Sequence, residues 1–437
     1  MKFARAGRGL FHFAAILDRS RRRDATRTRA PLWYATIAAS LIWSRSGAFI
    51  AALFISTFAT GLLLIAIPLE LRQLRATPGE IGITLSMFGL GMFIFEWVWG
   101  VLADRVGYRA PMIASLILYA AGVLLLARAD SVFFIAIAYL LASGMMVAVG
   151  PIGRSFIGTT LPPQYQGTGL ALLSAQWVIG EAIGAGAGGV LIDHVAIRNV
   201  LYGTALLPLL SAVLVVLVFR GYVEMHGRRS ATSEVADARP NGTSVVRVMI
   251  VTASIVLLFQ IGAGGELALL PLLVTSHLGL SAATAGTAMF IVGMLGGLLL
   301  VPGGMASDRW GRRPTMVAGG IISAAGFAVY AVAGAFGAVV LGAVLRVAGA
   351  SLLWPAATAW ISESSPRRSH ALVMGLFGEF ENVGVTIGPL LGGLAWSLAG
   401  IQAAFVTYAV ASLLAALVAA AAVGRRAARP APVSADA

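Results

Sequence analysis

The sequence predicts an all-α integral membrane protein in which twelve membrane-spanning helices form two pseudo-symmetric six-helix bundles. Three observations support this fold class. The 437 residues are 59% hydrophobic and only 11% charged, a composition that no water-soluble core could absorb. Twelve apolar runs reach the ~20 residues that cross a bilayer. One charged segment occurs twice, 204 residues apart.

The repeated segment is ten residues long. The first copy, Gly100–Arg109, reads Gly-Val-Leu-Ala-Asp-Arg-Val-Gly-Tyr-Arg, and the second, Gly304–Arg313, reads Gly-Met-Ala-Ser-Asp-Arg-Trp-Gly-Arg-Arg. The same offset relates Pro151 to Pro355 and brings a series of glycines onto glycines. One register over so many positions indicates a duplicated half. The residues that the copies share are Gly100, Asp104, Arg105, Gly107 and Arg109, and Gly304, Asp308, Arg309, Gly311 and Arg313.

The first 45 residues are expected to form a basic arm at the cytoplasmic membrane face. Ten of them are Lys or Arg and only two are acidic. Two apolar runs in the arm, 10–17 and 32–43, are too short to cross a bilayer and predict helices that lie in the interface. A cleavable signal peptide is not expected, because the small-residue cleavage pattern is missing.

After the arm, the apolar runs fall into two sets of six. The first set predicts an N-terminal bundle over 46–219, with spans at 47–69, 81–103, 110–128, 132–158, 168–192 and 199–219. The polar stretch 220–246 predicts a flexible cytoplasmic linker. The second set predicts a C-terminal bundle over 247–424 and leaves 425–437 as a cytoplasmic tail, with spans at 247–274, 282–303, 314–334, 336–361, 370–396 and 402–423.

The distribution of basic residues predicts the orientation, because cytoplasmic loops carry the excess of Lys and Arg. With the N-terminus inside, 25 of the 31 basic residues lie on the cytoplasmic side, four lie opposite, and Arg154 and Arg346 lie within spans. Both termini are then cytoplasmic, and the expected location is the inner (cytoplasmic) membrane of a bacterium. The net charge of +13 favours contact with anionic lipid in the bilayer, and no nucleic-acid partner is expected.

Two six-span halves, each with Gly-x-x-x-Asp-Arg-x-Gly-x-Arg between its second and third spans, resemble the major facilitator superfamily. The resemblance covers about residues 45–424, and the repeated segment is similar to the family signature called motif A. It implies a monomeric secondary transporter, not an enzyme, whose halves rock about a central site for a small molecule. Without cysteine, a metal-ligand cluster or a phosphate-binding loop, the chain is expected to use no cofactor, no metal and no ATP of its own.

A glycine-rich run in span 11 points to the twelve-span drug/proton antiporter group of this superfamily. The run is similar to the glycine–proline motif that proton-coupled exporters carry in span 5, whereas span 5 itself has Ala185 where the proline is expected. The alternative is close packing of small residues between helices, which holds for either direction of transport. The residues concerned are Gly180, Gly184, Gly188, Gly189, Gly384, Gly388, Pro389, Gly392 and Gly393.

Charged residues inside the spans are the candidates for proton coupling. Arg154 in span 4 is similar to an intramembrane arginine that exporters of the family use in proton transfer, and the alternative is that it extends to the headgroups. A carboxylate at this depth needs a proton, a partner or water. Glu181, near midspan, is the first choice, with Arg154 expected nearby. The other candidates are Glu96, Glu266 and Glu379, and at most one of Glu379 and Glu381 should face the cavity.

Amide, aromatic and basic side chains at similar depth are candidates to line the substrate cavity. For the tryptophans the alternative is packing or an interfacial belt. These candidates are Gln176, Trp177, Gln260, Trp354, Asn382 and Arg346.

The repeated segments predict a conformational latch between the halves. Asp104 is expected at the start of span 11, around Ser369 and His370, and Asp308 at the start of span 5, around Gly167 and Thr168. A carboxylate is stabilised at a helix N-terminus, so the latch would close the cytoplasmic side and favour the outward-open state.

The predicted function is proton-coupled export of small amphiphilic or drug-like molecules by alternating access. Two alternatives remain open. One is a proton-coupled importer, or symporter, of a small organic solute. The other is a non-transporting membrane sensor that uses the basic arm.

Overall fold

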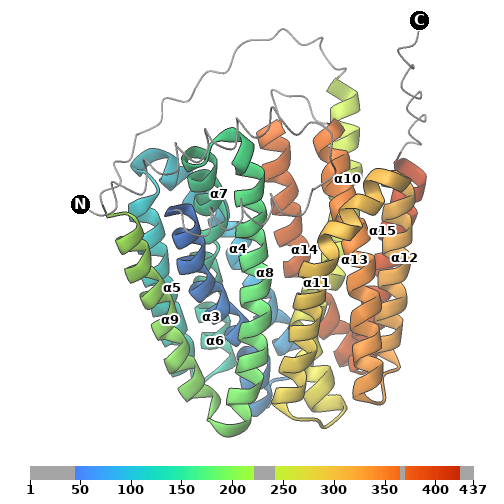
Figure 1. Ribbon diagram of the computed structural model, residues 1–437. Coiled ribbons are helices and arrows are strands. Elements are labelled where there is room, and N and C mark those ends of the chain that lie inside the picture. Colours follow the sequence, from blue (N-terminus) through green and yellow to red (C-terminus); the bar gives the residue numbers. More distant parts are fainter. Residues whose placement is uncertain (1–44, 221–241, 365–369, 424–437) are drawn as a thin grey trace, which may run out of the picture. The chain divides into compact units, whose positions relative to one another are not determined.

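The structure is a computed structural model that describes residues 45–220, 242–364 and 370–423, and every regular element in these ranges is helical (Figure 1). Twelve spans are long and apolar enough to cross a membrane, with α6 and α7 counted as one span. The predicted all-α, twelve-span fold class is therefore confirmed. The elements are α3 (Arg45–Gln73), α4 (Pro78–Val106), α5 (Arg109–Arg128), α6 (Val132–Met146), α7 (Val149–Thr160), α8 (Pro163–His194), α9 (Ile197–Val218), α10 (Gly242–Leu272), the π-helical turn η1 (Leu273–His277), α11 (Ala282–Trp310), α12 (Arg312–Ala331), α13 (Phe336–Ser364), α14 (His370–Ala399) and α15 (Ile401–Ala422). The predicted interfacial helices at 10–17 and 32–43 lie outside the described residues.

The helices repeat at the spacing found in the sequence. Adding 204 to the bounds of α4 gives the bounds of α11, and the same offset relates α6 and α7 to α13, and α9 to α15. The N-terminal caps also correspond, because the Thr77 hydroxyl accepts from the Glu80 N–H and the Ser281 hydroxyl from the Thr284 N–H. We call α3–α9 the N-terminal half and α10–α15 the C-terminal half.

The helices differ from the predicted spans at their ends and in two interruptions. Capping turns are polar, so helices such as α4 extend a few residues beyond the apolar run. The predicted span 132–158 is broken between α6 and α7, where Pro151 has no N–H for the Val147 carbonyl, which accepts from Gly150 at 2.9 Å instead. The π-helical turn that ends α10 was not predicted.

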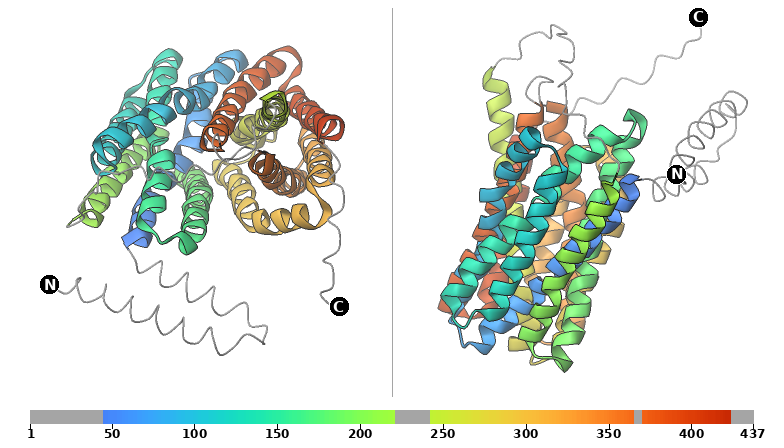
Figure 2. Two further views of the ribbon diagram at one scale, coloured as in Figure 1. Left: turned by 90° about the horizontal axis from the view of Figure 1, so that it is seen from above. Right: turned by 90° about the vertical axis from the view of Figure 1, so that its left-hand side faces the viewer.

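Two helix pairs join the halves: α4 packs on α14, and α8 packs on α11. Seen from above, the helices of the N-terminal half (blue to green) stand beside those of the C-terminal half (yellow to red) (Figure 2). We call the end of the helices that carries the repeated segments the motif end, and the opposite end the far end. Glycine pairs bring the helix backbones together near the far end. A Cβ atom added to Gly82 would lie 2.9 Å from the Gly393 Cα, and one added to Gly189 would lie 2.9 Å from the Gly286 Cα.

Two glycines toward the motif end show no such close approach. Gly167 on α8 and Gly378 on α14 have no non-neighbouring atom within 4 Å of an added Cβ, in contrast to the glycines near the far end of the same helices. The halves are thus packed against each other near the far end and make no contact at these two glycines toward the motif end.

Candidate functional site

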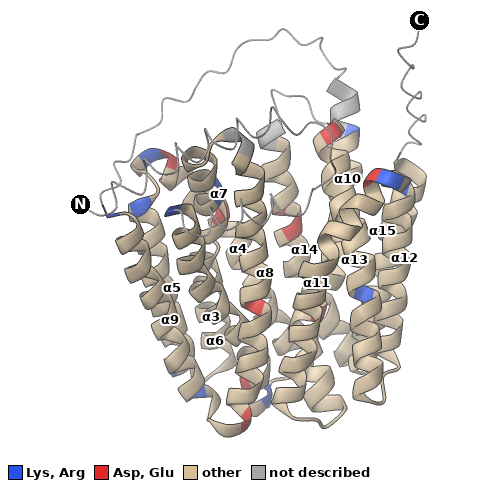
Figure 3. Ribbon diagram, in the orientation of Figure 1, with Lys and Arg blue, Asp and Glu red and all other residues tan. Residues whose placement is uncertain are grey.

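Charged residues lie mostly near the ends of the helices, with few in the middle of a helix (Figure 3). Those deep within the spans form three groups. A central cluster lies where α4, α7, α13 and α14 meet, Glu181 lies in the N-terminal half, and Glu266 pairs with Arg346 inside the C-terminal half.

Glu96 is the hub of the central cluster. Its Oε1 forms an ion pair with the Arg154 guanidinium on α7 at 2.6 Å, and its Oε2 accepts a hydrogen bond from the Asn382 amide on α14 at 2.8 Å. Asn382 is 4% exposed, whereas the side chains of Arg154 and Glu96 are 59% and 19% exposed. One carboxylate therefore contacts both halves and is still partly exposed.

Two further carboxylates on α14 lie within electrostatic reach of Glu96. Glu379 stands one turn before Asn382, and its buried Oε2 accepts no hydrogen bond from the described residues. Glu381 accepts a hydrogen bond from the Trp354 indole of α13. Glu379 and Glu381 are two positions apart on α14 and so cannot share a helix face. Both carboxylates nevertheless belong to the central cluster.

The structure does not bring Arg154 to Glu181 as expected, because the guanidinium is paired with Glu96. Glu181 is partly buried and forms no ion pair with a basic residue in the described part of the chain. Its carboxylate lies within electrostatic reach of Tyr119 on α5 and Tyr139 on α6, both fully enclosed. The Glu181 carboxylate thus lies near two tyrosines of its own half.

Some of the residues predicted to line the substrate cavity belong to the central cluster, and the others lie at contacts between helices. Trp354 and Asn382 belong to the central cluster. Gln176 is buried and its Oε1 accepts from the Thr57 hydroxyl of α3 at 3.0 Å, while its Nε2 has no partner among the described residues. Trp177 packs against the main apolar core, and Gln260 lies against Gly384 between α10 and α14.

Glu266 and Arg346 are enclosed in the C-terminal half. Glu266 is 1% exposed, forms an ion pair with Arg346 and accepts a hydrogen bond from the Tyr330 hydroxyl at 2.8 Å. The positions 204 residues earlier are Leu62, Leu126 and Ala142, so the N-terminal half has buried apolar residues at the equivalent positions.

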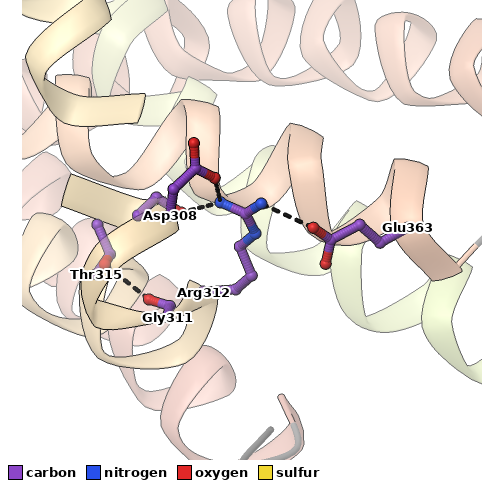
Figure 4. Close-up of polar contacts among 6 residues, drawn as sticks. Asp308, Gly311, Arg312, Thr315 and Glu363 are labelled. Atoms are coloured by element: carbon purple, nitrogen blue, oxygen red, sulfur yellow. Dashed lines mark hydrogen bonds and ion pairs between the residues drawn. The ribbon is translucent and has the colours of Figure 1, made fainter. Parts of the chain in front are cut away.

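The second repeated segment holds a network of charges at the motif end (Figure 4). The Arg312 guanidinium lies between two carboxylates, with Asp308 at 2.6 Å and Glu363 of α13 at 2.7 Å. Gly311 turns the chain between α11 and α12 with φ of 94°, a conformation that favours glycine. Arg313, which the repeat pairs with Arg109, donates instead to the Ala420 carbonyl.

The first repeated segment has different residues at two positions of this network. Tyr108 and Thr159 occupy the positions that correspond to Arg312 and Glu363. Asp104 is exposed and forms no ion pair or hydrogen bond with the described residues. The sequence comparison missed Arg312 because it considered only residues shared by both copies. The contacts predicted for Asp104 and Asp308 across the halves would require the motif end to close, and they remain predictions.

The glycine motif in α8 and α14 lies at helix contacts. Gly184 packs on the backbone of α3, and its counterpart Gly388 packs in the same way on α10. Gly180 and Gly188 also face α3, while Gly384 faces α10 and Gly392 faces α15. Gly189 and Gly393 form the contacts between the halves, and the Pro389 carbonyl lies against Gly82. These contacts support the packing interpretation of the motif.

The sequence matches the model of the Major Facilitator Superfamily over residues 49–296 and 252–436. It is similar to the multidrug resistance protein MdtG of Escherichia fergusonii, at 26% identity over 267 residues, which cover 59% of this chain and 63% of MdtG, less than two thirds of that relative. It is also similar to the class B tetracycline resistance protein of Escherichia coli, at 24% identity over 339 residues, which cover 76% of this chain and 83% of that protein.

Solved structures share the fold. A mutant of the nucleoside transporter NupG superposes with a TM-score of 0.72 at 15% identity, covering 87% of this chain and 100% of that one. A bacterial homologue of the human lysosomal transporter Spinster, in an inward-facing and unoccupied conformation, gives a TM-score of 0.71 at 12% identity, covering 86% and 96%.

Proposed function

The chain belongs to the major facilitator superfamily, and from this premise we propose that it exports small amphiphilic molecules in exchange for protons by alternating access. The names of two relatives, a multidrug resistance protein and a tetracycline resistance protein, support export. We place the motif end in the cytoplasm, because the twelve-span topology then puts 25 of the 31 basic residues on that side. The conformation described here is then inward-open.

The observation that carries the proposal is the shared carboxylate of Glu96. An ionised Glu96 holds Arg154 in its own half and Asn382 in the other half, at 2.6 and 2.8 Å. A hydrogen bond to a charged group contributes roughly 1.5–3 kcal/mol. A proton on Glu96 would weaken both contacts, and a change of this size shifts a two-state balance by about tenfold or more.

This geometry gives an order of events. The inward-open protein has an ionised Glu96 that solvent can reach, so it can accept a substrate from the cytoplasm. After the halves rock, protonation of Glu96 from the outside would displace the substrate and release Asn382. Return to the inward-open state delivers the proton to the cytoplasm and restores the contacts of Glu96 with Arg154 and Asn382.

The test is transport in inside-out membrane vesicles, with tetracycline and a lipophilic cation dye as probes. We expect an acidic vesicle interior to drive probe accumulation by the wild-type protein, because the interior corresponds to the outside of the cell. Glu96→Gln should abolish accumulation while probe binding remains measurable. Glu80→Gln is the matched control: Glu80 lies on the same helix, where it caps the far end, and glutamine can also serve in a capping box.

Three other outcomes would change the proposal. Continued accumulation by Glu96→Gln would remove Glu96 as the proton site, and Glu181→Gln would then test the candidate that the sequence favoured. Accumulation driven by the opposite gradient would indicate a symporter. Absence of flux under either gradient for every probe would favour the sensor.

A further inference from the structure

Asp193, near the end of α8, joins the two halves at the far end. Its Oδ1 accepts a hydrogen bond from the Ala282 N–H at 2.9 Å, and its Oδ2 accepts one from the Ala283 N–H at 3.0 Å. Ala282 and Ala283 are the first two residues of α11. A side chain of the N-terminal half thus binds the first turn of a helix of the C-terminal half.

This contact completes the N-terminal cap of α11. The first N–H groups of a helix have no partner within the helix. Ser281 supplies an acceptor for the Thr284 N–H at 3.2 Å, and Asp193 supplies acceptors for the two N–H groups before it. The cap of α11 is therefore divided between the two halves of the protein.

The equivalent helix α4 caps itself. The Glu80 carboxylate accepts from the Thr77 N–H at 2.7 Å, and the Thr77 hydroxyl accepts from the Glu80 N–H at 3.3 Å. In α11, Thr284 stands at the position of Glu80, so this internal acid is missing. At the position of Asp193, α14 carries Ser397, whose hydroxyl donates to Leu394 of its own helix. The link between the halves therefore exists at only one of two symmetric places.

We propose that Asp193 is a positioning residue that biases the transporter toward the conformation that opens to the motif end. A carboxylate at a helix N-terminus is stabilised by the helix dipole and by charge-assisted hydrogen bonds. Asp193 adjoins the contact of Gly189 with Gly286, so opening of the far end would carry the carboxylate away from α11. The interaction then stabilises one access state and not the other. The inference depends on neither the proton site nor the substrate of the proposed function.

The experiment measures the distance between the halves at the far end. Spin labels are attached to cysteines introduced at Tyr202 of α9 and Val332, directly after α12, which are 41% and 81% exposed, in a chain that has no cysteine of its own. We expect mainly the short distance in the wild-type protein. In Asp193→Asn the amide oxygen keeps at most one contact and no charge, and the ratio of open to closed far ends should rise by about threefold to tenfold.

A second variant separates a link between the halves from a simple helix cap. Asp193→Asn combined with Thr284→Glu gives α11 the internal capping box that α4 has, without a contact to the other half. We expect the raised open fraction to persist in this double variant, while Ser397→Ala, the symmetric control, leaves the distances unchanged. An unchanged distribution in Asp193→Asn, or full recovery in the double variant, would overturn the proposal. Distances are measured without substrate or proton gradient, so the result is independent of the transport assay.

Discussion

At the residue scale, the interior charges show what the sequence can and cannot predict. The presence of Glu96, Arg154 and Glu181 within spans follows from the apolar runs around them. Their partners do not, because a pairing depends on the rotation of each helix about its axis. Arg154 therefore forms its pair with Glu96 and not with the expected Glu181.

Interior charged residues such as Glu96 and Arg154 stand at positions where the two copies of the repeat differ. Glu96 and Arg154 correspond to Leu300 and Thr358 in the second half, and Asn382 corresponds to Val178 in the first. Each charged residue of the central cluster has an uncharged counterpart in the other half, and the same comparison singles out Arg312, opposite Tyr108, and Asp193, opposite Ser397. Positions where the copies differ were thus informative about the candidate site.

The buried pair of Glu266 and Arg346 gives a stability prediction. Arg346→Met would leave Glu266, at 1% exposure, without its cation and should destabilise the protein by about 3–5 kcal/mol, because an uncompensated charge stays buried. The combined change of Glu266→Leu, Tyr330→Leu and Arg346→Ala places the apolar residues of the other half at these three positions. It should recover most of that loss, measured as thermal unfolding in detergent.

Equal unfolding temperatures for the single and the triple variant would contradict this structural role. The pair would then need another explanation, such as proton coupling by Glu266 or substrate contact by Arg346, the roles that the sequence suggested.

At the scale of elements, helix positions were predictable and the contacts between helices only in part. Apolar length predicts where a helix crosses the bilayer, and the repeated glycines predict close packing. The partner of each glycine depends on the fold: Gly184 meets α3 within its half, while Gly189, five residues later, meets α11 in the other half. The break at Val147–Ala148 has no counterpart at Pro355 within α13, so a proline alone could not predict it.

The contact between Gly82 and Gly393 gives a prediction about conformation. In Gly82→Ala the new methyl group would lie 2.7 Å from the Pro389 carbonyl oxygen and 2.9 Å from the Gly393 Cα, so α4 and α14 would have to separate at the far end. Overpacking costs about 1–3 kcal/mol, and only the conformation with this contact is affected. Maleimide labelling of a cysteine placed at Gly378, on the motif side, should therefore slow by roughly fivefold or more.

Gly79→Ala provides the matched control, because Gly79 lies one turn earlier on α4 with no non-neighbouring atom within 4 Å of an added Cβ. If both variants label at the wild-type rate, the close approach of α4 and α14 does not determine the access state.

At the scale of the whole molecule, the repeat and the composition were sufficient to predict the fold. Two halves with twelve spans follow from one offset and from apolar length. The access state does not follow, because both states of an alternating-access transporter use the same helices and differ only in which ends touch. The division into arm, bundles, linker and tail remains a prediction, since the arm and most of the linker lie outside the described residues.

The orientation in the membrane gives the prediction at this scale. Reporters fused after Ala437, and within residues 228–242, should both register as cytoplasmic, because both positions lie on the side that carries most of the Arg residues. Paired green fluorescent protein and alkaline phosphatase fusions measure this directly. Phosphatase activity from either position would refute the twelve-span topology with both termini inside.

The duplicated glycine contacts have an evolutionary consequence. Gly82 against Gly393 and Gly286 against Gly189 are two copies of one contact. The halves therefore meet at two equivalent helix contacts, α4 with α14 and α11 with α8. A substitution at any of these four glycines changes a contact that belongs to both halves. A charged residue introduced in one half leaves the residue at the equivalent position of the other half unchanged. The duplicated glycine contacts thus constrain the packing of both halves together, whereas a charged residue can change in one half alone.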